Sequence, residues 1–374
     1  MPELEVSVVG LGIMGSCTLW RLAARGVRAV GYDRYRPPHA LGSSHGHSRV
    51  VRRLQFEGDH YVPLADRAYQ LWAQLEQETG RPLFTRTGLL FIGPPDSQLI
   101  RGGRESAQRH GLAHELLGTE ELRRRHPQHR VLPGEIGLLD PEAGFISPED
   151  AISAALERAQ AMGAEVRAGE PVRELKGRTV VAAGTWLGGL VPELAPQVRL
   201  ERHFFAWLPV REPAAFAPDR FPIWIRESPA ATGRAIEESH AHSERILAFG
   251  FPSTDGSRVK VGFPVTGVPA DSPEVDSRPR PQESAMLTQR CLDGLLDGVL
   301  AEPSDFTVCL YDNSPDGDFI IGSPPGRPEL TVLGGFSGHG FKHAPAVGEI
   351  AAALATGEAP PVEVSAWSPG RLLG

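Results

Sequence analysis

The chain has 374 residues, of which 41% are hydrophobic, and it carries a formal net charge of -8. A chain of this length exceeds what one hydrophobic core usually serves, so we expect two domains with enough buried volume to enclose a cofactor. The negative charge is spread along the sequence and the basic residues form short clusters, which argues against nucleic acid or an acidic membrane as a partner.

The first residues, MPELEVSVVG, enter an apolar strand without the basic and then apolar order of a secretory signal. The most apolar stretch, VVAAGTWLGGLV, is too short and too rich in glycine to span a bilayer. Three cysteines without a CxxC pair indicate neither a disulfide framework nor a thiolate metal site, and we expect no bound metal. These features favour a cytoplasmic protein that is not attached to a membrane.

A strand, a glycine-rich turn and a helix open the chain, and a second strand ends at Asp33. Gly10, Gly12 and Gly15 have the spacing GxGxxG, which permits a tight turn, close approach of the backbone to a pyrophosphate and close helix packing. An acid at the position of Asp33 accepts hydrogen bonds from a ribose hydroxyl and disfavours NADP. We therefore predict a dinucleotide site in preference to a plain structural turn, although this motif does not distinguish FAD from NAD.

The following segments continue the alternation of helices and strands. Residues 61–80 place apolar side chains at helical spacing and end in glycine, and residues 85–94 have the pattern of a strand. After a weakly patterned, Arg-rich stretch, residues 135–163 predict a strand, a turn and a helix that starts near Ser147 and Pro148. Two more strands are expected directly after this helix.

We predict an α/β fold in which a Rossmann-like dinucleotide-binding domain is joined to a substrate domain with an antiparallel sheet. Strands separated by one helix near residues 148–195 indicate a return to the first sheet, as does the strand, turn and helix pattern of residues 331–357. The middle of the chain has proline-rich turns and strand-like runs. We assign the first domain to residues 1–85, 148–195 and 305–374, and the second to residues 86–147 and 196–304.

Four separated segments carry a family resemblance. HSRVVR, RVKVG, VCLYDNSPDGDFIIG and GGFSGHGFK resemble, in this order, the monomeric sarcosine oxidase and N-methyltryptophan oxidase family, and the likeness covers nearly the whole chain. The resemblance implies a monomeric two-domain flavoprotein, with FAD attached through a cysteine thioether. It also implies oxidation of an N-methyl or cyclic secondary amino acid by O2 to an imine that water hydrolyses, with release of hydrogen peroxide.

The resemblance places the flavin attachment at Cys309, although a lone cysteine between two apolar residues is usually a small buried side chain. Arg52 and Lys342 fall where the family holds the substrate carboxylate, a task that suits a guanidinium fork and an ammonium group. The alternative for Arg49, Arg52 and Arg53 is a solvated basic face, or pairing with acids such as Glu57. For Lys342 it is a surface lysine, yet a lysine near a helix start opposes the helix dipole and needs a compensating reason. For Arg53 the solvated alternative is preferred.

Lys260 corresponds to the lysine that activates oxygen in the family. In the sequence it alternates with Val259 and Val261, which by itself favours an ordinary solvent-facing lysine on an antiparallel strand. A buried cation beside reduced flavin would instead lower the cost of forming superoxide. We expect Arg49 to share this role and His45 to touch the flavin, although loop histidines are often only surface residues.

The resemblance assigns two further groups to the site. Gly338 and Gly340 form a turn whose N–H groups suit the negative charge of reduced flavin. Tyr311, two residues beyond Cys309, is placed beside the substrate.

The sequence departs from the family at several positions. Ser44 and His47 replace a histidine and an aspartate in the loop near the flavin. Phe249 and Pro264 stand where sarcosine oxidase has a pocket tyrosine and a histidine, so a more apolar pocket should favour a bulkier or less polar substrate side chain. Residues 226–243 are longer than in relatives and suggest either a lid or a disordered loop.

Only an unprotonated amine has a lone pair to support this oxidation, so activity should rise with pH as the bound amine loses its proton. A flavin dehydrogenase that delivers electrons to a protein or a quinone is the first alternative, and Lys260 favours the oxidase over it. An NAD-dependent dehydrogenase and a non-catalytic dinucleotide-binding protein are the others. The sequence does not identify the amine.

Overall fold

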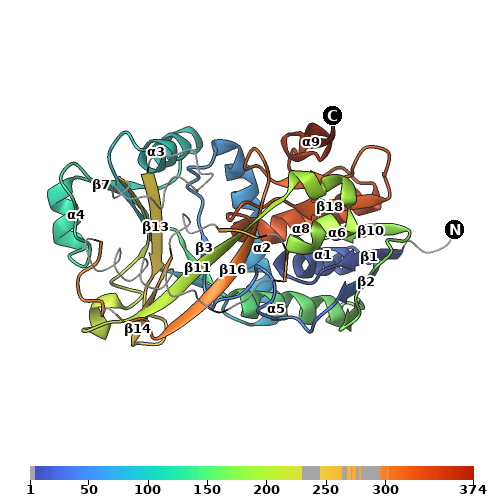
Figure 1. The fold of residues 1–374 in the computed structure, drawn as a ribbon, viewed down its shortest axis with the longest axis horizontal. Coiled ribbons are helices and arrows are strands. Elements are labelled where there is room, and N and C mark those ends of the chain that lie inside the picture. Colours follow the sequence, from blue (N-terminus) through green and yellow to red (C-terminus); the bar gives the residue numbers. More distant parts are fainter. Residues whose placement is uncertain are drawn as a thin grey trace.

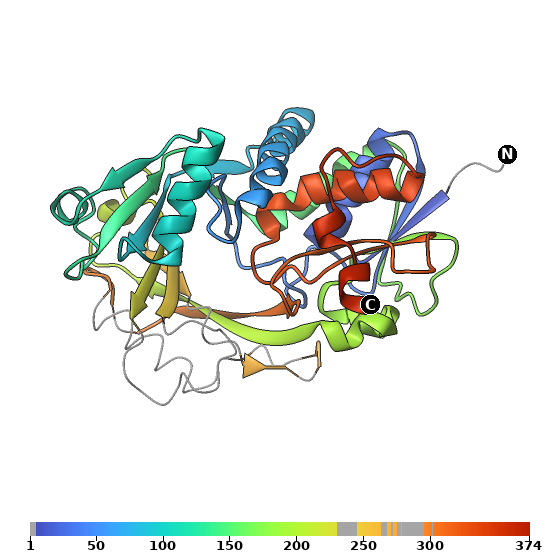
Figure 2. The same ribbon diagram turned by 90° about the horizontal axis from the view of Figure 1, so that it is seen from above.

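The computed structural model describes residues 5–229, 245–262, 268–270, 272–274, 278, 295–300 and 302–374. In these residues the chain forms two large sheets and a small one, and Figures 1 and 2 show the two large sheets side by side along the long axis of the molecule. The α/β class predicted from the sequence is confirmed.

The first sheet has, within the described residues, the strand order β17-β18-β10-β1-β2-β9. Every pair is parallel except β17 with β18. Because β1 lies between β2 and β10, the predicted βαβ unit and the return of the chain to its sheet are both confirmed. The strands are β1 (Glu5–Val9), β2 (Arg28–Asp33), β9 (Glu165–Ala168), β10 (Arg178–Val181), β17 (Ile320–Gly322) and β18 (Leu330–Gly334).

Helices pack against one another beside this sheet, with α1 against α5 and α8, and α2 against α5 and α8. Their bounds are α1 (Ile13–Ala24), α2 (Val62–Thr79), α5 (Pro148–Ala161) and α8 (Ala344–Thr356). As predicted, α5 begins after Ser147, whose hydroxyl accepts the backbone N–H of Asp150 at 3.2 Å. As predicted, α2 ends at Gly80, which has a φ of 67°.

The second sheet has, among the described residues, the order β15-β11-β14-β13-β12-β5-β7-β6, with β16 paired along β11. Its pairs are antiparallel except β12 with β5, which agrees with the antiparallel sheet predicted for the middle of the chain. The strands are β5 (Leu89–Gly93), β6 (Glu115–Leu117), β7 (Ile136–Asp140), β11 (Arg199–Pro209), β12 (Ile223–Pro229), β13 (Arg245–Phe251), β14 (Arg258–Gly262), β15 (Val268–Pro269) and β16 (Asp305–Asn313).

The long strands β11 and β16 run together between the two parts of the molecule (Figure 1). The division of the chain into two domains stays a prediction. The pairing of β16 with β11 favours a boundary after Asn313 over the predicted boundary at residue 305.

Several elements were not predicted from the sequence. One is a small sheet of β3 (Arg49–Val51), β8 (Gly144–Ile146) and β4 (Phe84–Arg86), in which β3 lies between the predicted second strand and the predicted helix of residues 61–80. The Arg-rich stretch contains two helices, α3 (Gln98–His110) and α4 (Thr119–Arg125). The short elements are α6 (Leu187–Leu190), α9 (Gly370–Leu373), η1 (Asp59–Tyr61), η2 (Gly184–Trp186), η3 (Pro192–Gln197), η4 (Pro213–Phe216), η7 (Phe341–His343) and η8 (Ser365–Trp367). In the part of the chain that the structure describes, none of the helices has both the length and the apolar character of a membrane span.

Candidate active site

The glycine-rich turn joins β1 to α1 in close contact with both elements. A Cβ atom at Gly15 would lie 1.8 Å from the carbonyl oxygen of Gly10, so α1 approaches the turn more closely than any other residue would allow. Asp33, at the end of β2, accepts the backbone N–H groups of Leu11 and Tyr35, each at 2.8 Å. Burial would raise the pKa of Asp33, but hydrogen bonds from His39, Tyr35 and Leu11 hold it below its ordinary value, so this carboxylate is charged.

A cavity of about 630 Å³ is lined at one end by this turn and at the other by residues from the second sheet. The turn end includes Gly10, Gly12 and Asp33. Gly12, the N-cap residue of α1, has no side chain and leaves room for a phosphate at the helix N-terminus. The cavity therefore extends from a turn that could hold a dinucleotide to the side chains of the second sheet.

At the far end of the cavity, two buried cations converge on one carboxylate. Arg52, which follows β3, forms an ion pair with Glu57, and Lys342, in η7, donates to the same Oε1 atom at 3.4 Å. Burial would raise the pKa of Glu57, but Arg52 and Lys342 hold it well below its ordinary value. Burial and Arg52 lower the pKa of Lys342 to about 7, although Glu57 opposes this. The pair thus holds the Glu57 carboxylate. The alternative of solvated cations is wrong for both residues, whereas the alternative that Arg52 pairs with Glu57 is confirmed.

The arginine that follows Arg52 differs in its surroundings. Arg53 is half-buried and pairs with Asp66 and Glu142, each at 3.0 Å. It does not line the cavity, which agrees with the alternative preferred for it from the sequence.

Lys260 lies on β14, between β11 and β13, and only 3% of its surface is exposed. Its ammonium group donates to the carbonyl oxygens of Gly46 and Ser48, at 2.7 and 3.0 Å. Burial, followed by the charge of Arg49, lowers the pKa of Lys260 well below its ordinary value. The solvent-facing lysine suggested by the alternation is therefore wrong, because the face opposite Val259 and Val261 is covered by the 46–48 loop.

Cys309, on β16, is buried beside two basic side chains. Its sulfur lies 3.1 Å from a guanidinium nitrogen of Arg49 and 3.4 Å from Nε2 of His45. Burial would raise the pKa of this thiol, but Arg49 and His45 lower it to about 7. Arg49 lines the cavity, as does Leu310, the residue directly after Cys309. An inert, purely apolar cysteine does not fit these surroundings.

Aromatic side chains from the second sheet form one wall of the cavity. Phe249 packs against Phe205, with 5.5 Å between ring centroids, and Phe251 also lines the wall. Tyr311 lines the cavity and stacks on His203, with ring centroids 3.8 Å apart. Pro264 lies outside the described residues, as does the part of the longer segment beyond Pro229 that was expected to be a lid or a loop.

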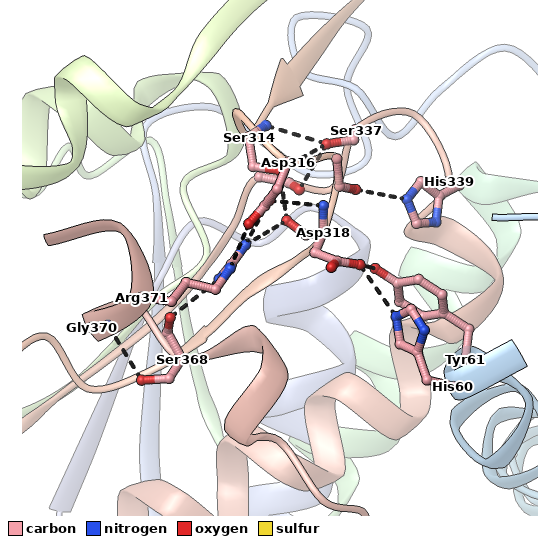
Figure 3. Close-up of polar contacts among 12 residues, drawn as sticks. His60, Tyr61, Ser314, Asp316, Asp318, Ser337, His339, Ser368, Gly370 and Arg371 are labelled. Carbon is pink, nitrogen blue, oxygen red and sulfur yellow. Dashed lines mark hydrogen bonds and ion pairs between the residues drawn. The ribbon is translucent and has the colours of Figure 1, made fainter. Parts of the chain in front are cut away.

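The turn before Lys342, residues 337–340, is held in place by a polar network that is shown in Figure 3. Gly338 and Gly340 of this turn line the cavity. Ser337 accepts the backbone N–H of Ser314 at 3.2 Å, and His339 Nε2 lies 3.2 Å from the carbonyl oxygen of Gly317.

The same network extends to the surface (Figure 3). Asp318 accepts the hydroxyl of Tyr61 at 2.6 Å, and Arg371 of α9 forms an ion pair with Asp316 at 2.8 Å. Segments from three distant parts of the chain thus fix the position of the turn.

Sequence reasoning missed two acids of the site. Asp312 lines the cavity, accepts the backbone N–H of Gly335 at 2.9 Å, and has its pKa raised to about 6 by burial. Glu149, at the start of α5, accepts the backbone N–H of Gly46 at 2.7 Å. The strand pattern around Asp312 gave a weak signal for its burial, whereas nothing in the sequence connects Glu149 with a loop 103 residues away.

Comparison with known proteins identifies the family of this chain. A family model described as FAD dependent oxidoreductase matches residues 5–354. The monomeric sarcosine oxidase of Streptomyces avermitilis is 34% identical to this chain, over 99% of the chain and 98% of that protein. The N-methyl-L-tryptophan oxidase of Salmonella agona is 31% identical, over 97% of each.

A solved structure has the same fold. NikD, described as an unusual amino acid oxidase essential for nikkomycin biosynthesis, is 25% identical, with a TM-score of 0.81 over 98% of each chain. These similarities confirm the resemblance that the motifs indicated, and they decide in favour of FAD over NAD.

Proposed function

We propose the following reaction for this chain, which belongs to the FAD-dependent oxidoreductase family: the oxidation of an N-methylated or cyclic secondary amino acid to an imine that water hydrolyses, with release of hydrogen peroxide. When bound, FAD supplies the acceptor for two electrons and passes them to dioxygen. Gly10, Gly12, Gly15 and Asp33 would hold its dinucleotide part.

One observation carries the proposal, namely that Arg52 and Lys342 meet at a single buried carboxylate inside the cavity. In our proposal the carboxylate of the amino acid binds to these two cations in addition to the Glu57 carboxylate. A guanidinium and an ammonium that grip one end of a small substrate leave its amine and the adjacent C–H bond in a fixed orientation. Tyr311, which lies against Gly338 of the turn before Lys342, would support this orientation.

Lys260 and Arg49 are assigned to the reaction with dioxygen. Electron transfer to dioxygen creates an anion, and a positive charge already in place lowers the cost of forming it where water is excluded. The burial of Lys260 and its direction toward the cavity support this assignment.

Cys309 is assigned to covalent attachment of the flavin. A thiolate is the nucleophilic form of cysteine, and a pKa of about 7 makes that form common at neutral pH. Arg49 and His45 favour the thiolate by their charge and hydrogen bonding. Gly338 and Gly340 would present N–H groups to the reduced ring.

The aromatic wall selects the substrate side chain. Phe249, Phe205 and Phe251 offer apolar contact and no hydrogen-bonding group in their side chains. We therefore expect a substrate with a bulkier or more apolar side chain than sarcosine to be preferred.

A screen of N-methyl and cyclic amino acids for peroxide production tests the proposal. We expect anaerobic bleaching of a yellow protein by the preferred amine, followed by rapid recovery of colour in oxygen. Bleaching without recovery would instead identify a dehydrogenase with another acceptor, and a colourless protein active with NAD would refute the flavin assignment. A monomer in the cytoplasm is also expected, and size-exclusion chromatography and cell fractionation test these two properties.

A further inference from the structure

Glu149 connects α5 to the loop that contacts Lys260. Its carboxylate accepts the backbone N–H of Gly46 at 2.7 Å and that of His47 at 3.3 Å. Gly46 and His47 have φ angles of 97° and 65°, and the second is unfavourable for a residue with a side chain. The carboxylate thus accepts two consecutive N–H groups of a loop whose conformation needs outside support.

The opposite side of the same loop faces Lys260. The carbonyl oxygens of Gly46 and Ser48 accept hydrogen bonds from the ammonium group, and the Ser48 hydroxyl lies 3.3 Å from it. The peptide group that joins Gly46 to His47 therefore lies between an anion and a cation, because its N–H faces Glu149 and its carbonyl oxygen faces Lys260. Glu149 polarises this peptide group in the direction that strengthens the hydrogen bond between its oxygen and Lys260.

Charged and aromatic groups from several elements surround the ammonium. They are Arg49 of β3, Cys309 of β16, Glu149 of α5, the loop oxygens of Gly46 and Ser48, and the rings of Phe205, Trp207 and Phe251 on β11 and β13. Arg49 disfavours the charge on Lys260, whereas Cys309 and Glu149 favour it. A cysteine joined to the flavin by a thioether has no charge. Glu149 is then the remaining anion among these described groups.

We propose that Glu149 is a positioning residue for the reaction with dioxygen, which holds the 46–48 loop against Lys260 and keeps the Lys260 ammonium charged. This role rests on the proposed function, because it concerns the step assigned to Lys260. The simpler explanation is that Glu149 only stabilises the first turn of α5 through the helix dipole. Asp150 is exposed in the same turn and provides the matched control.

Two variants separate the charge of Glu149 from its hydrogen bonds. Glu149→Gln keeps an oxygen that can accept the Gly46 N–H but removes the negative charge. Glu149→Ala removes both, and Asp150→Asn removes a neighbouring charge of the same helix turn. Stopped-flow absorbance of the holoenzyme measures anaerobic reduction by the amine and reoxidation by dioxygen from pH 6 to 10. Hydrogen–deuterium exchange of residues 42–48 measures the loop without any turnover.

The rate constant of reoxidation should fall at high pH as Lys260 loses its proton. In Glu149→Gln we expect this fall to occur about one pH unit lower than in the unmodified protein, because a favourable charge has been lost. Reduction by the amine should stay within about twofold, since Arg52 and Lys342 are untouched. Glu149→Ala should also exchange deuterium faster in residues 42–48, and Asp150→Asn should match the unmodified protein in each measurement.

The proposal is overturned if Glu149→Gln keeps the pH profile of reoxidation unchanged, or if Asp150→Asn shifts it equally. Unchanged deuterium exchange in Glu149→Ala would likewise contradict the anchoring of the loop. Failure of the proposed function looks different, because the unmodified protein would then not be reduced by any amine.

Discussion

The pair of Arg52 and Lys342 predicts that Lys342 takes up a proton when a carboxylate ligand binds. Burial and Arg52 lower the pKa of this ammonium from 10.5 to about 7, a difference that corresponds to about 5 kcal/mol against the charged form. An anionic ligand restores the charge, so above pH 7 each binding event must be accompanied by protonation of Lys342. The dissociation constant should therefore be constant below pH 7 and rise about tenfold per pH unit above it, until the pKa of the complex is reached.

A simple carboxylate without an amine isolates this effect, because the amine of a substrate would titrate in the same range. Titration of the holoenzyme with butyrate, followed by flavin absorbance, should give a dissociation constant about 50-fold larger at pH 9 than at pH 7. Lys342→Met should bind butyrate weakly at every pH, and its dissociation constant should not depend on pH. Arg52→Gln should weaken binding but keep the slope, and Lys176→Met, in which a 76% exposed side chain is changed, should leave both unchanged.

A dissociation constant that is independent of pH in the unmodified protein would refute this reasoning, as would a slope that survives in Lys342→Met. His339 does not provide an alternative source of the slope, because burial and Lys342 lower its pKa to about 4.

Three other predictions follow from the same structure. Lys260→Met should slow reoxidation by dioxygen about 100-fold or more while anaerobic reduction by the amine is retained, and equal slowing of both steps would contradict its assignment. Cys309→Ser should release its flavin into the supernatant after acid precipitation, whereas the unmodified protein should keep the colour in the pellet; free flavin from both would exclude the thioether. Burial lowers the pKa of His126 from 6.5 to about 4, so the unfolded chain binds the proton first and the free energy of unfolding should fall by up to about 3 kcal/mol as the pH drops from 6.5 to 4. Denaturant titrations should show that His126→Gln reduces this fall, and an identical pH dependence in the variant would assign it to other groups.

The elements predicted correctly are those whose signals are local. The GxGxxG turn, the acid at the end of β2 and the serine-proline start of α5 each depend on residues close in sequence. By contrast, β3 is three residues long and exists because it pairs with β8, so Arg49 lies opposite Ile146. Helices α3 and α4 were missed because few of their buried residues are large and apolar. The buried residues of α3 do recur at helical spacing, but only Leu99 and Ile100 are large apolar side chains, and α4 buries only Leu122.

The residues of the candidate site could be predicted from the sequence, but the hydrogen bonds and ion pairs between them could not. Resemblance named Arg52, Lys342 and Lys260, and all three line the cavity. The alternation on β14 defined two faces, but which face is covered depends on the fold of a loop more than 200 residues earlier. The links through Glu57 and Glu149 have the same origin, since each joins side chains that only the folded chain brings together.

The order of strands in the first sheet has a consequence for how the protein is made. β1, α1 and β2 leave the ribosome early, but β18 and Lys342 follow only after about 300 further residues, which takes roughly 15 to 60 seconds of synthesis. During that interval the nascent nucleotide-binding unit exposes apolar strand edges and lacks the turn that completes the flavin pocket. Chaperones can therefore bind the unfinished chain throughout this interval, and we expect FAD to bind only after nearly all of the chain has been translated.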